Sequence, residues 1–285
     1  MQTVHSVSQV REYVRGWHNK GLSVGFVPTM GNLHEGHLSL IKEAHARCDV
    51  VVVSIFVNPT QFGPNEDFDR YPRTLDADAA ALVDAGTDLL FAPSVDEMYP
   101  LGQNQTWVDV DNLGDYLCGA SREGHFRGVT TVVSKLFNIV QPDVAVFGEK
   151  DFQQLAIIRR MAEELCFPVK IVGAATSRES DGLARSSRNG FLSESERKLA
   201  PRLYRQLQQL KADIEAGERD FRALEKRHGE ALDQAGFQVD YLTIAEARSL
   251  APAGENDTNL VIAAAAKLGQ TRLIDNVSLA VVRTP

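Results

Sequence analysis

The chain has 285 residues, of which 44% are hydrophobic and 24% charged, and this composition excludes the disordered and fibrous classes of protein. Its 30 lysines and arginines against 38 aspartates and glutamates give a formal net charge of −8, which argues against a large nucleic-acid-binding surface. No apolar run reaches the roughly 18 residues that a membrane span needs, and the first residues lack the apolar core of a signal peptide. We therefore expect a cytoplasmic protein with neither nucleic-acid nor membrane partners.

Short apolar runs alternate with amphipathic segments over the first part of the chain. Strands are predicted at residues 23–29, 50–57, 88–92, 143–147 and 169–173, and helices at 37–47, 74–85, 128–140 and 151–165. Near-continuous apolar runs such as VVVSIFV are typical of strands buried on both faces of a sheet. The alternation predicts an α/β fold with a Rossmann-like, doubly wound parallel sheet, whose ligand site lies at the carboxyl ends of the strands.

The pattern changes after about residue 176. Ser193 and Glu196 form a capping box ahead of a helix whose apolar positions run from Leu199 to Ile214. A second helix is predicted at 220–235 and strands at 239–244 and 271–276, while the alanine-rich segment 259–268 fits either a strand or a helix. We expect two domains, 1–175 with the Rossmann-like sheet and 176–285 as a smaller C-terminal α+β domain.

Three cysteines, Cys48, Cys118 and Cys166, are widely spaced and form no C-x-x-C pair. Neither a disulfide framework nor a thiolate zinc site is therefore indicated. Cys166 stands between Leu165 and Phe167, and we expect it to be a small buried hydrophobic residue.

The strongest local signal is the segment VPTMGNLHEGHLSL. A predicted strand ends at Thr29, a turn follows at Gly31, and the next helix opens with His34 and His37 on one face of its first turn. Free backbone N–H groups at a helix N-terminus favour an anion, and the two imidazoles could donate to phosphate oxygens. Two ordinary surface histidines, or a metal pair that lacks the third ligand zinc needs, are the alternatives.

Further polar groups stand beside other predicted strand ends and on a later loop. Gln61, just after VVVSIFV, offers both a donor and an acceptor, although a plain turn explains it equally well. Lys150 follows the strand VAVF and is either a solvated charge or a phosphate ligand, and Asp151 beside it could simply cap the next helix. The segment 185–188 places two hydroxyls between two cations, a composition suited to phosphate oxygens but also common in solvated loops.

These motifs carry a resemblance to known enzymes. A strand followed by H-x-G-H at a helix start resembles the nucleotidylyltransferase superfamily, which includes the class I aminoacyl-tRNA synthetases. The longer strings PTMGNLHEGHLSLI, SIFVNPTQFGPNEDFDRYPRT, GHFRGVTTVVSKLFNIVQPDVAVFGEKDFQQL, DGLARSSRNGFLS and TRLIDN are similar to those of the pantoate–β-alanine ligases, and they span most of the chain.

The resemblance implies an enzyme that condenses (R)-pantoate with β-alanine to pantothenate through a pantoyl-adenylate intermediate, releasing pyrophosphate and AMP. ATP is then a substrate, accompanied by Mg²⁺ because a metal neutralises triphosphate charge. The first domain would bind ATP and pantoate, and the second would act as a lid. A homodimer is also implied.

The resemblance further implies the site residues. Catalysis is assigned to His37, as proton donor, and to His34 and Lys150. ATP binding is assigned to Met30, Gly31, Asn32, Leu33, His34, Glu35, Gly36, His37, Gly148, Glu149, Lys150, Asp151, Ser177, Arg185, Ser186, Ser187 and Arg188. Pantoate binding is assigned to Gln61, Gln154, Pro28, Phe62, Val132 and Val133, and β-alanine binding to Gln61 and Asn58.

Two positions depart from the family pattern, which usually has an apolar residue in place of Arg185 and a valine in place of Ser177. The protein ligand of the metal is unknown, with Asp78 a candidate. The alternative function is a nucleotidylyltransferase that passes AMP or CMP to a small phosphorylated substrate. A tRNA-charging enzyme would need a basic surface, and a nucleotide sensor would have little use for both histidines, Lys150 and both glutamines.

Overall fold

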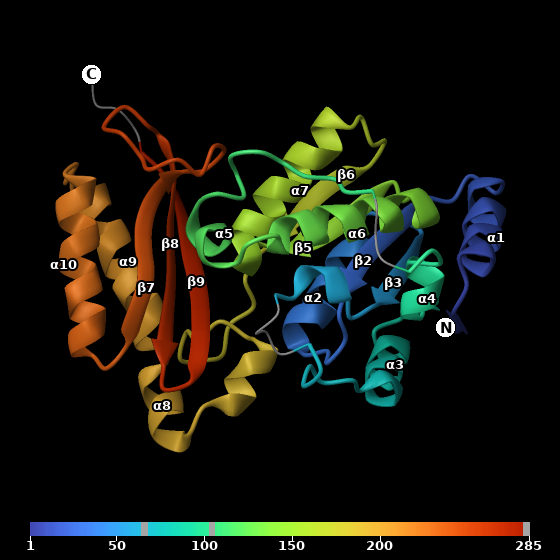
Figure 1. The fold of residues 1–285 in the computed structure, drawn as a ribbon, viewed down its shortest axis with the longest axis horizontal. Helices are drawn as coiled ribbons and strands as arrows, with labels where there is room; N and C mark the ends of the chain where they lie inside the picture. The colour runs from blue at the N-terminus through green and yellow to red at the C-terminus, as the bar shows by residue number, and fades with distance from the viewer. Residues whose placement is uncertain (64–67, 103–105, 282–285) are drawn as a thin grey trace. The chain divides into compact units, whose positions relative to one another are not determined.

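The computed structural model describes residues 1–63, 68–102 and 106–281 of the chain. These fold into two compact units (Figure 1). The first consists of Met1–Asp111, Arg122–Glu149 and Gln154–Ala175, and the second of Asn112–Ser121, Lys150–Gln153 and Thr176–Pro285. The predicted division after residue 175 did not anticipate the two short segments, 112–121 and 150–153, that belong to the second unit. Residues 64–67, inside one of the motifs quoted above, lie outside the described part.

A six-stranded sheet forms the centre of the first unit. Its order is β1-β4-β3-β2-β5-β6, and every neighbouring pair is parallel. The strands are β1 (Gln2–Val4), β2 (Val24–Thr29), β3 (Val50–Ile55), β4 (Leu89–Phe91), β5 (Val144–Gly148) and β6 (Lys170–Ala174). The predicted Rossmann-like sheet is therefore confirmed.

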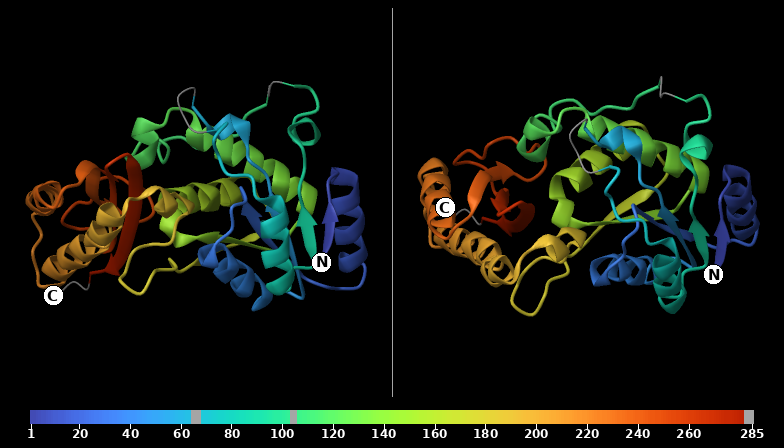
Figure 2. Two further views of the ribbon diagram at one scale, coloured as in Figure 1. Left: turned by 90° about the horizontal axis from the view of Figure 1, so that it is seen from below. Right: turned by 60° about the horizontal axis from the view of Figure 1, so that its bottom comes forward.

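Helices cover both faces of this sheet, as Figures 1 and 2 show. Val24 and Phe26 pack with α1 (Val7–His18), α6 (His125–Val140) and α7 (Phe152–Glu164). Val27 of the same strand packs on the opposite face, with α2 (Glu35–His45) and α3 (Leu75–Asp84). Alternate side chains of one strand thus enter two separate cores, which explains why the strand sequences are apolar at nearly every position.

The first eighteen residues contain two elements that the sequence analysis did not predict. Strand β1 has only three residues, and helix α1 buries only Val10 and Val14 fully. A signal was present, because the Ser6 side chain accepts from Gln9 N while the Gln9 side chain accepts from Ser6 N, a capping box. Short helices α4 (Val95–Met98) and α5 (Leu117–Ser121) were also not predicted.

The second unit has an antiparallel sheet in the order β7-β8-β9. Its strands are β7 (Gln238–Glu246), β8 (Asn259–Leu268) and β9 (Thr271–Ala280), and its helices are α8 (Glu194–Leu199), α9 (Arg202–Glu215) and α10 (Phe221–Gln234). Side chains of α9 and α10 share a core with one face of the sheet. The alanine-rich segment is the central strand, where Ala263, Ala264, Ala265 and Ala266 are all buried.

Two expectations from the sequence were wrong. The helix predicted from Leu199 to Ile214 is two helices, because Pro201 lacks the N–H that a continuous helix would need. Its predicted capping box is present, with Ser193 and Glu196 bonded reciprocally at the start of α8. Cys166 is exposed rather than buried, since the chain leaves α7 there through a left-handed turn with φ of 54°.

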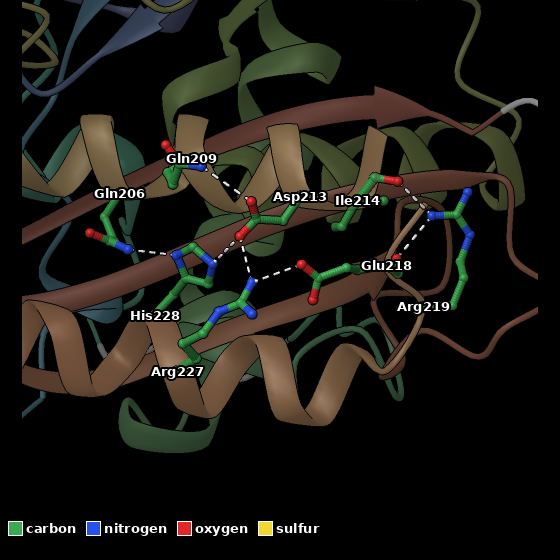
Figure 3. Close-up of polar contacts among 8 residues, drawn as sticks. All are labelled: Gln206, Gln209, Asp213, Ile214, Glu218, Arg219, Arg227 and His228. Carbon is green, nitrogen blue, oxygen red and sulfur yellow. Dashed lines mark hydrogen bonds and ion pairs between the residues drawn. The ribbon is translucent and has the colours of Figure 1, made fainter. Parts of the chain in front are cut away.

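A polar cluster links α9 to α10 within the second unit (Figure 3). The His228 side chain is 3% exposed, and its Nε2 lies 2.9 Å from Asp213 Oδ2. Arg227 also donates to that carboxylate, and Gln209 donates to its other oxygen. Partial burial raises the pKa of the Asp213 carboxyl, but the hydrogen bonds from His228, Gln209 and Arg227 outweigh burial and hold the pKa below its usual value.

We predict that Asp213→Asn lowers the thermal stability of the protein at neutral pH and matters less in acid. A carboxyl whose folded-state pKa is depressed stabilises the fold above its unfolded pKa, about 3.9, and loses that contribution as the pH falls through the folded-state value. The difference in Tm between wild type and variant, measured from pH 7 to about pH 3, should therefore shrink towards the acid end. Glu230→Gln, on the exposed side of α10, is the matched control. A constant difference across this range would contradict the prediction.

Candidate active site

The loop after β2 leaves the sheet through two left-handed residues, Gly31 with φ of 82° and Asn32 with φ of 53°. A Cβ on Gly31 would lie 3.0 Å from Asp78 Oδ2 and 3.1 Å from the Ile55 side chain. Both the backbone conformation and the lack of space therefore require glycine at this turn.

Asp78 fixes the next part of this loop. Its side chain lies on α3 and is 3% exposed. Oδ2 accepts from Asn32 N at 2.9 Å and from Thr74 Oγ1 at 3.1 Å, and Oδ1 accepts from Leu33 N at 2.8 Å. Both oxygens of the candidate metal ligand thus hold backbone or side-chain donors of the protein, so Asp78 acts in this structure as an anchor for the loop.

Two histidines cap the helix that follows. His34 is the N-cap of α2, and its Nδ1 accepts from Gly36 N at 3.1 Å. His37, in the first turn, accepts at its Nδ1 from His34 N at 3.2 Å. A ring nitrogen that accepts from a backbone N–H carries no hydrogen, so both neutral imidazoles hold their hydrogen on Nε2. The rings lie 4.2 Å apart between centroids. This arrangement gives the start of α2 two Nε2–H donors, while the backbone N–H groups of Gly36, His37 and Leu38 donate to His34.

Gln61 lies in the turn η1 (Pro59–Gln61), where a second buried side chain holds it. Asn58 is 1% exposed, and its Nδ2 donates to Gln61 Oε1 at 3.1 Å and to Gly128 O at 3.2 Å. Tyr99 donates its hydroxyl to Asn58 Oδ1 at 2.7 Å. Burial raises the pKa of the Tyr99 phenol, which keeps this donor protonated. Asn58, predicted to bind β-alanine, thus has its amide bonded to the protein itself.

Helix α6 passes very close to this turn. A Cβ on Gly128 would lie 2.3 Å from Thr60 O, so only glycine allows the approach. His125 Nδ1 lies 2.8 Å from Gln61 O, and Gln61 Nε2 lies 3.0 Å from Met30 Sδ. Of the predicted apolar site residues, Val132 and Val133 on α6 are buried, whereas Pro28 and Phe62 are partly exposed.

The segment after β5 is divided between the two units. Gly148 and Glu149 belong to the first, whereas Lys150 and Asp151 belong to the second and lie in the turn η2 (Glu149–Asp151). Within the second unit, Asn276 Nδ2 donates to Lys150 O at 2.9 Å. The Lys150 ammonium lies 4.0 Å from the Asp151 carboxylate. Gln154, which directly follows the second-unit segment Lys150–Gln153, belongs to the first unit and is partly buried.

Hydrogen bonds and an ion pair fix the start of the predicted phosphate loop, residues 185–188, in the second unit. Arg185 N donates to Ser177 O at 2.9 Å, and the Arg185 guanidinium lies 3.2 Å from the Glu179 carboxylate. Ser186 caps the turn η3 (Ser187–Phe191) by accepting from Arg188 N. The two departures from the family pattern, Ser177 and Arg185, therefore meet each other through their backbones.

A comparison with protein families covers nearly the whole chain. The model described as pantoate-β-alanine ligase matches residues 2–278. The chain belongs to this family. Pantothenate synthetase of Alcanivorax borkumensis is 81% identical to the chain over 283 residues, 99% of each protein. Pantothenate synthetase of Pseudomonas fluorescens is 57% identical over 280 residues, 98% of each.

Solved structures agree with this assignment. Pantothenate synthetase from Thermus thermophilus is similar with a TM-score of 0.89 and 47% identity, covering 97% of this chain and 99% of that one. Pantoate-β-alanine ligase from Francisella tularensis, complexed with β-γ ATP and β-alanine, is similar with a TM-score of 0.79 and 34% identity over 97% of each chain. The resemblance stated from the motifs is therefore confirmed, and the protein is an ATP-dependent ligase that joins pantoate to β-alanine.

Sequence reasoning missed the side chains that hold the site. Asp78 was considered only as a metal ligand, and Tyr99, Asp275 and Asn276 were not singled out. Asp78 and Tyr99 lie outside the quoted motifs, and although Asp275 and Asn276 end the motif TRLIDN, the sequence does not reveal their partners, because each of these residues acts on a part of the chain distant in sequence. Among the described residues, no group of three or more His, Cys, Asp or Glu could hold a metal ion. In the same part of the chain, no helix is long and apolar enough to cross a membrane.

We predict that Asp78→Asn lowers kcat/KM for ATP by about tenfold or more. One amide oxygen would replace two carboxylate oxygens, so at least one backbone N–H of the loop would lose a charged acceptor, a loss of about 1.5–3 kcal/mol. Steady-state kinetics with ATP varied and the other substrates saturating would measure the effect. Asp84→Asn, exposed at the end of the same helix, is the matched control and should leave the kinetics unchanged. Equal kinetics for the two variants would refute the anchoring role.

Proposed function

We propose that the protein makes pantothenate in two steps. In the first, a carboxylate oxygen of (R)-pantoate attacks the α-phosphorus of ATP, the bond to the bridging oxygen breaks, and pyrophosphate leaves. The product is pantoyl adenylate. In the second, the amine nitrogen of β-alanine attacks the acyl carbon, the bond to the AMP oxygen breaks, and the amine releases a proton. Adenylation supplies the leaving group that a free carboxylate lacks.

The observation that carries this proposal is the pair of histidines at the start of α2. Each ring accepts a backbone N–H at Nδ1, so each neutral ring can donate only from Nε2. Negative charge grows on the phosphate oxygens during attack, and donors already held in place stabilise that charge without reorganising. We assign catalysis to His37, which the family resemblance makes the proton donor, and to His34. Residues 30–37 form the proposed ATP-binding loop.

Residues 148–151, Ser177 and 185–188 complete the proposed ATP-binding set. Lys150 provides a mobile point charge for the phosphates, and the hydroxyls and guanidinium groups of 185–188 suit phosphate oxygens. The relative from Francisella tularensis was solved with a nucleotide and β-alanine, which supports both substrates for this chain.

Pantoate is assigned to Gln61 and Gln154, with Pro28, Phe62, Val132 and Val133 as apolar neighbours, and β-alanine to Gln61. Gln61 is well suited to recognise a hydroxyl, because its amide offers a donor and an acceptor. We propose that Asn58 serves β-alanine binding through Gln61, since its own amide bonds to Gln61, Gly128, Tyr99 and Thr60.

We also propose that ATP enters as its Mg²⁺ complex. The carboxylate of Asp78 is already hydrogen-bonded to the protein, which favours an ion bound mainly by the triphosphate. A homodimer and a cytoplasmic location remain predictions that rest on the family resemblance and on the composition.

The decisive experiment follows the products formed by the purified protein from ATP, Mg²⁺ and D-pantoate, with and without β-alanine. AMP and pantothenate should accumulate only when both pantoate and β-alanine are present. Pyrophosphate formed with a phosphorylated acceptor and no amine would instead support a nucleotidylyltransferase. ATP that binds without being consumed would indicate a sensor.

We predict different effects for two substitutions of His37. Asparagine can replace Nδ1 as an acceptor but lacks a donor at the position of Nε2, so His37→Asn should keep the fold and slow adenylation by about 10²-fold. His37→Gln places its amide nearer the position of Nε2 and should retain more of the rate. Single-turnover formation of pantoyl adenylate is the measurement, with Tm as the check on folding. Equal rates for both variants would exclude the donor role.

A further inference from the structure

The motif TRLIDN ends with two polar residues that the proposed chemistry does not use. Asp275 is 4% exposed and Asn276 is 8% exposed, and both lie on β9 in the second unit. Successive residues of a strand point to opposite faces of the sheet. Leu273 and Val277 lie in the core with α9 and α10, which places Asp275 on the helix-covered face and Asn276 on the other. The strand therefore presents two buried polar groups to two different segments.

Asp275 pairs with the guanidinium of Arg178, which lies at the base of the predicted phosphate loop, residues 185–188. Its carboxylate accepts from both terminal nitrogens of Arg178, at 2.6 and 2.9 Å. Arg178 also donates to Gly182 O at 3.1 Å, and its guanidinium lies over the Tyr204 ring, 3.5 Å from the centroid. The guanidinium is thus engaged by the protein, so Arg178 acts on substrate only through the chain that it holds.

That chain is the loop from Ser177 to Arg188. Arg178 pairs with Ala184 in an isolated β-bridge, and Arg185 N donates to Ser177 O beside it. Holding Arg178 therefore fixes both ends of the turn 178–184 and sets where the following residues 185–188 begin. A bidentate arginine–carboxylate pair restricts orientation as well as distance, which suits it to this task.

Asn276 holds the other segment. Its Nδ2 donates to Lys150 O at 2.9 Å, while its backbone N donates to Asp275 Oδ1 at 2.8 Å. The hydrogen bond to Lys150 reaches the main chain and leaves the ammonium group to other partners. Asp275 and Asn276, which are adjacent on β9, thus hold the backbone of the 177–188 loop and of Lys150.

We propose that Asp275 and Asn276 are positioning residues for the adenylation step, holding the 177–188 loop and Lys150 in a fixed relation to each other. The proposal rests on the phosphate-binding roles proposed above for Lys150 and the loop. Charge stabilisation of a transition state depends on donors held in place, and a displacement of about 1 Å can cost about 10²-fold in rate. A strand paired along its whole length is a rigid support for such a task.

The test is a double-mutant cycle on the single-turnover rate of pantoyl-adenylate formation, using the full chain. Lys150→Ala should slow this step by about 10²-fold and Asn276→Ala by about tenfold or more. If Asn276 acts through Lys150, the double variant should be no slower than Lys150→Ala alone, because the losses of coupled residues do not add. Losses that multiply in the double variant would overturn the role of Asn276.

The Arg178 pair is tested by Asp275→Asn and Arg178→Lys. Arg178→Lys keeps the charge but cannot form the bidentate pair, and it tests the same contact if Asp275→Asn does not fold. Both should weaken ATP binding and slow adenylation by about tenfold, while the aminolysis of supplied pantoyl adenylate changes less. Rates and ATP affinity equal to those of the wild type would overturn the role of Asp275.

Asp213→Asn is the control, because it makes the same substitution in another polar cluster of the same unit, where Asp213 is partly buried and pairs with the buried His228. Asp213→Asn should lower Tm and leave the adenylation rate unchanged. If it slowed adenylation as much as Asp275→Asn does, the effect of Asp275→Asn would be explained by general destabilisation, and the positioning role of Asp275 would be refuted. A Lys150→Ala variant with the wild-type rate would instead refute the proposed function of Lys150 itself.

Discussion

The carboxylate of Asp78 accepts two backbone N–H groups from the loop after β2, and the placement of the histidine pair follows from those bonds. A buried carboxylate is costly unless it is hydrogen-bonded, so the loop and the side chain stabilise each other. The same bonds hold Asn32 in a left-handed conformation shortly before the N-cap of α2. The start of the helix, and with it both Nε2–H donors, is therefore set by one residue on α3.

In two other places, a buried polar residue holds a candidate site residue. Asn58 is buried and orients Gln61, and Asn276 is buried and bonds to the backbone of Lys150. The residues assigned to substrate are mostly partly exposed, whereas those that hold them have little contact with solvent. A buried polar group without a hydrogen bond costs free energy, so each buried supporting residue has few alternative positions. The substrate-binding group that it contacts therefore has a defined position as well.

Much of the fold was predictable, and the failures have local causes. The apolar strands and the amphipathic α6 follow from periodicity, which reports burial directly. Strand β1 is too short to show a period, and the alanine-rich β8 fits either element because small side chains leave no contrast between its faces. Pro201 could have divided α8 from α9, but the apolar spacing continues across it. Cys166 is exposed because of where α7 ends, which composition does not report.

The sequence by itself determined the family, the parallel sheet and the segments that carry the chemistry, since motif identity and strand patterning are local properties of the chain. Only the tertiary structure decided which side chains support those segments. Asn32 and Asp78 are 46 positions apart, and Arg178 and Asp275 are 97 positions apart. Such pairs form because packing of the sheets and helices brings them within hydrogen-bonding distance, and burial then makes the bond necessary.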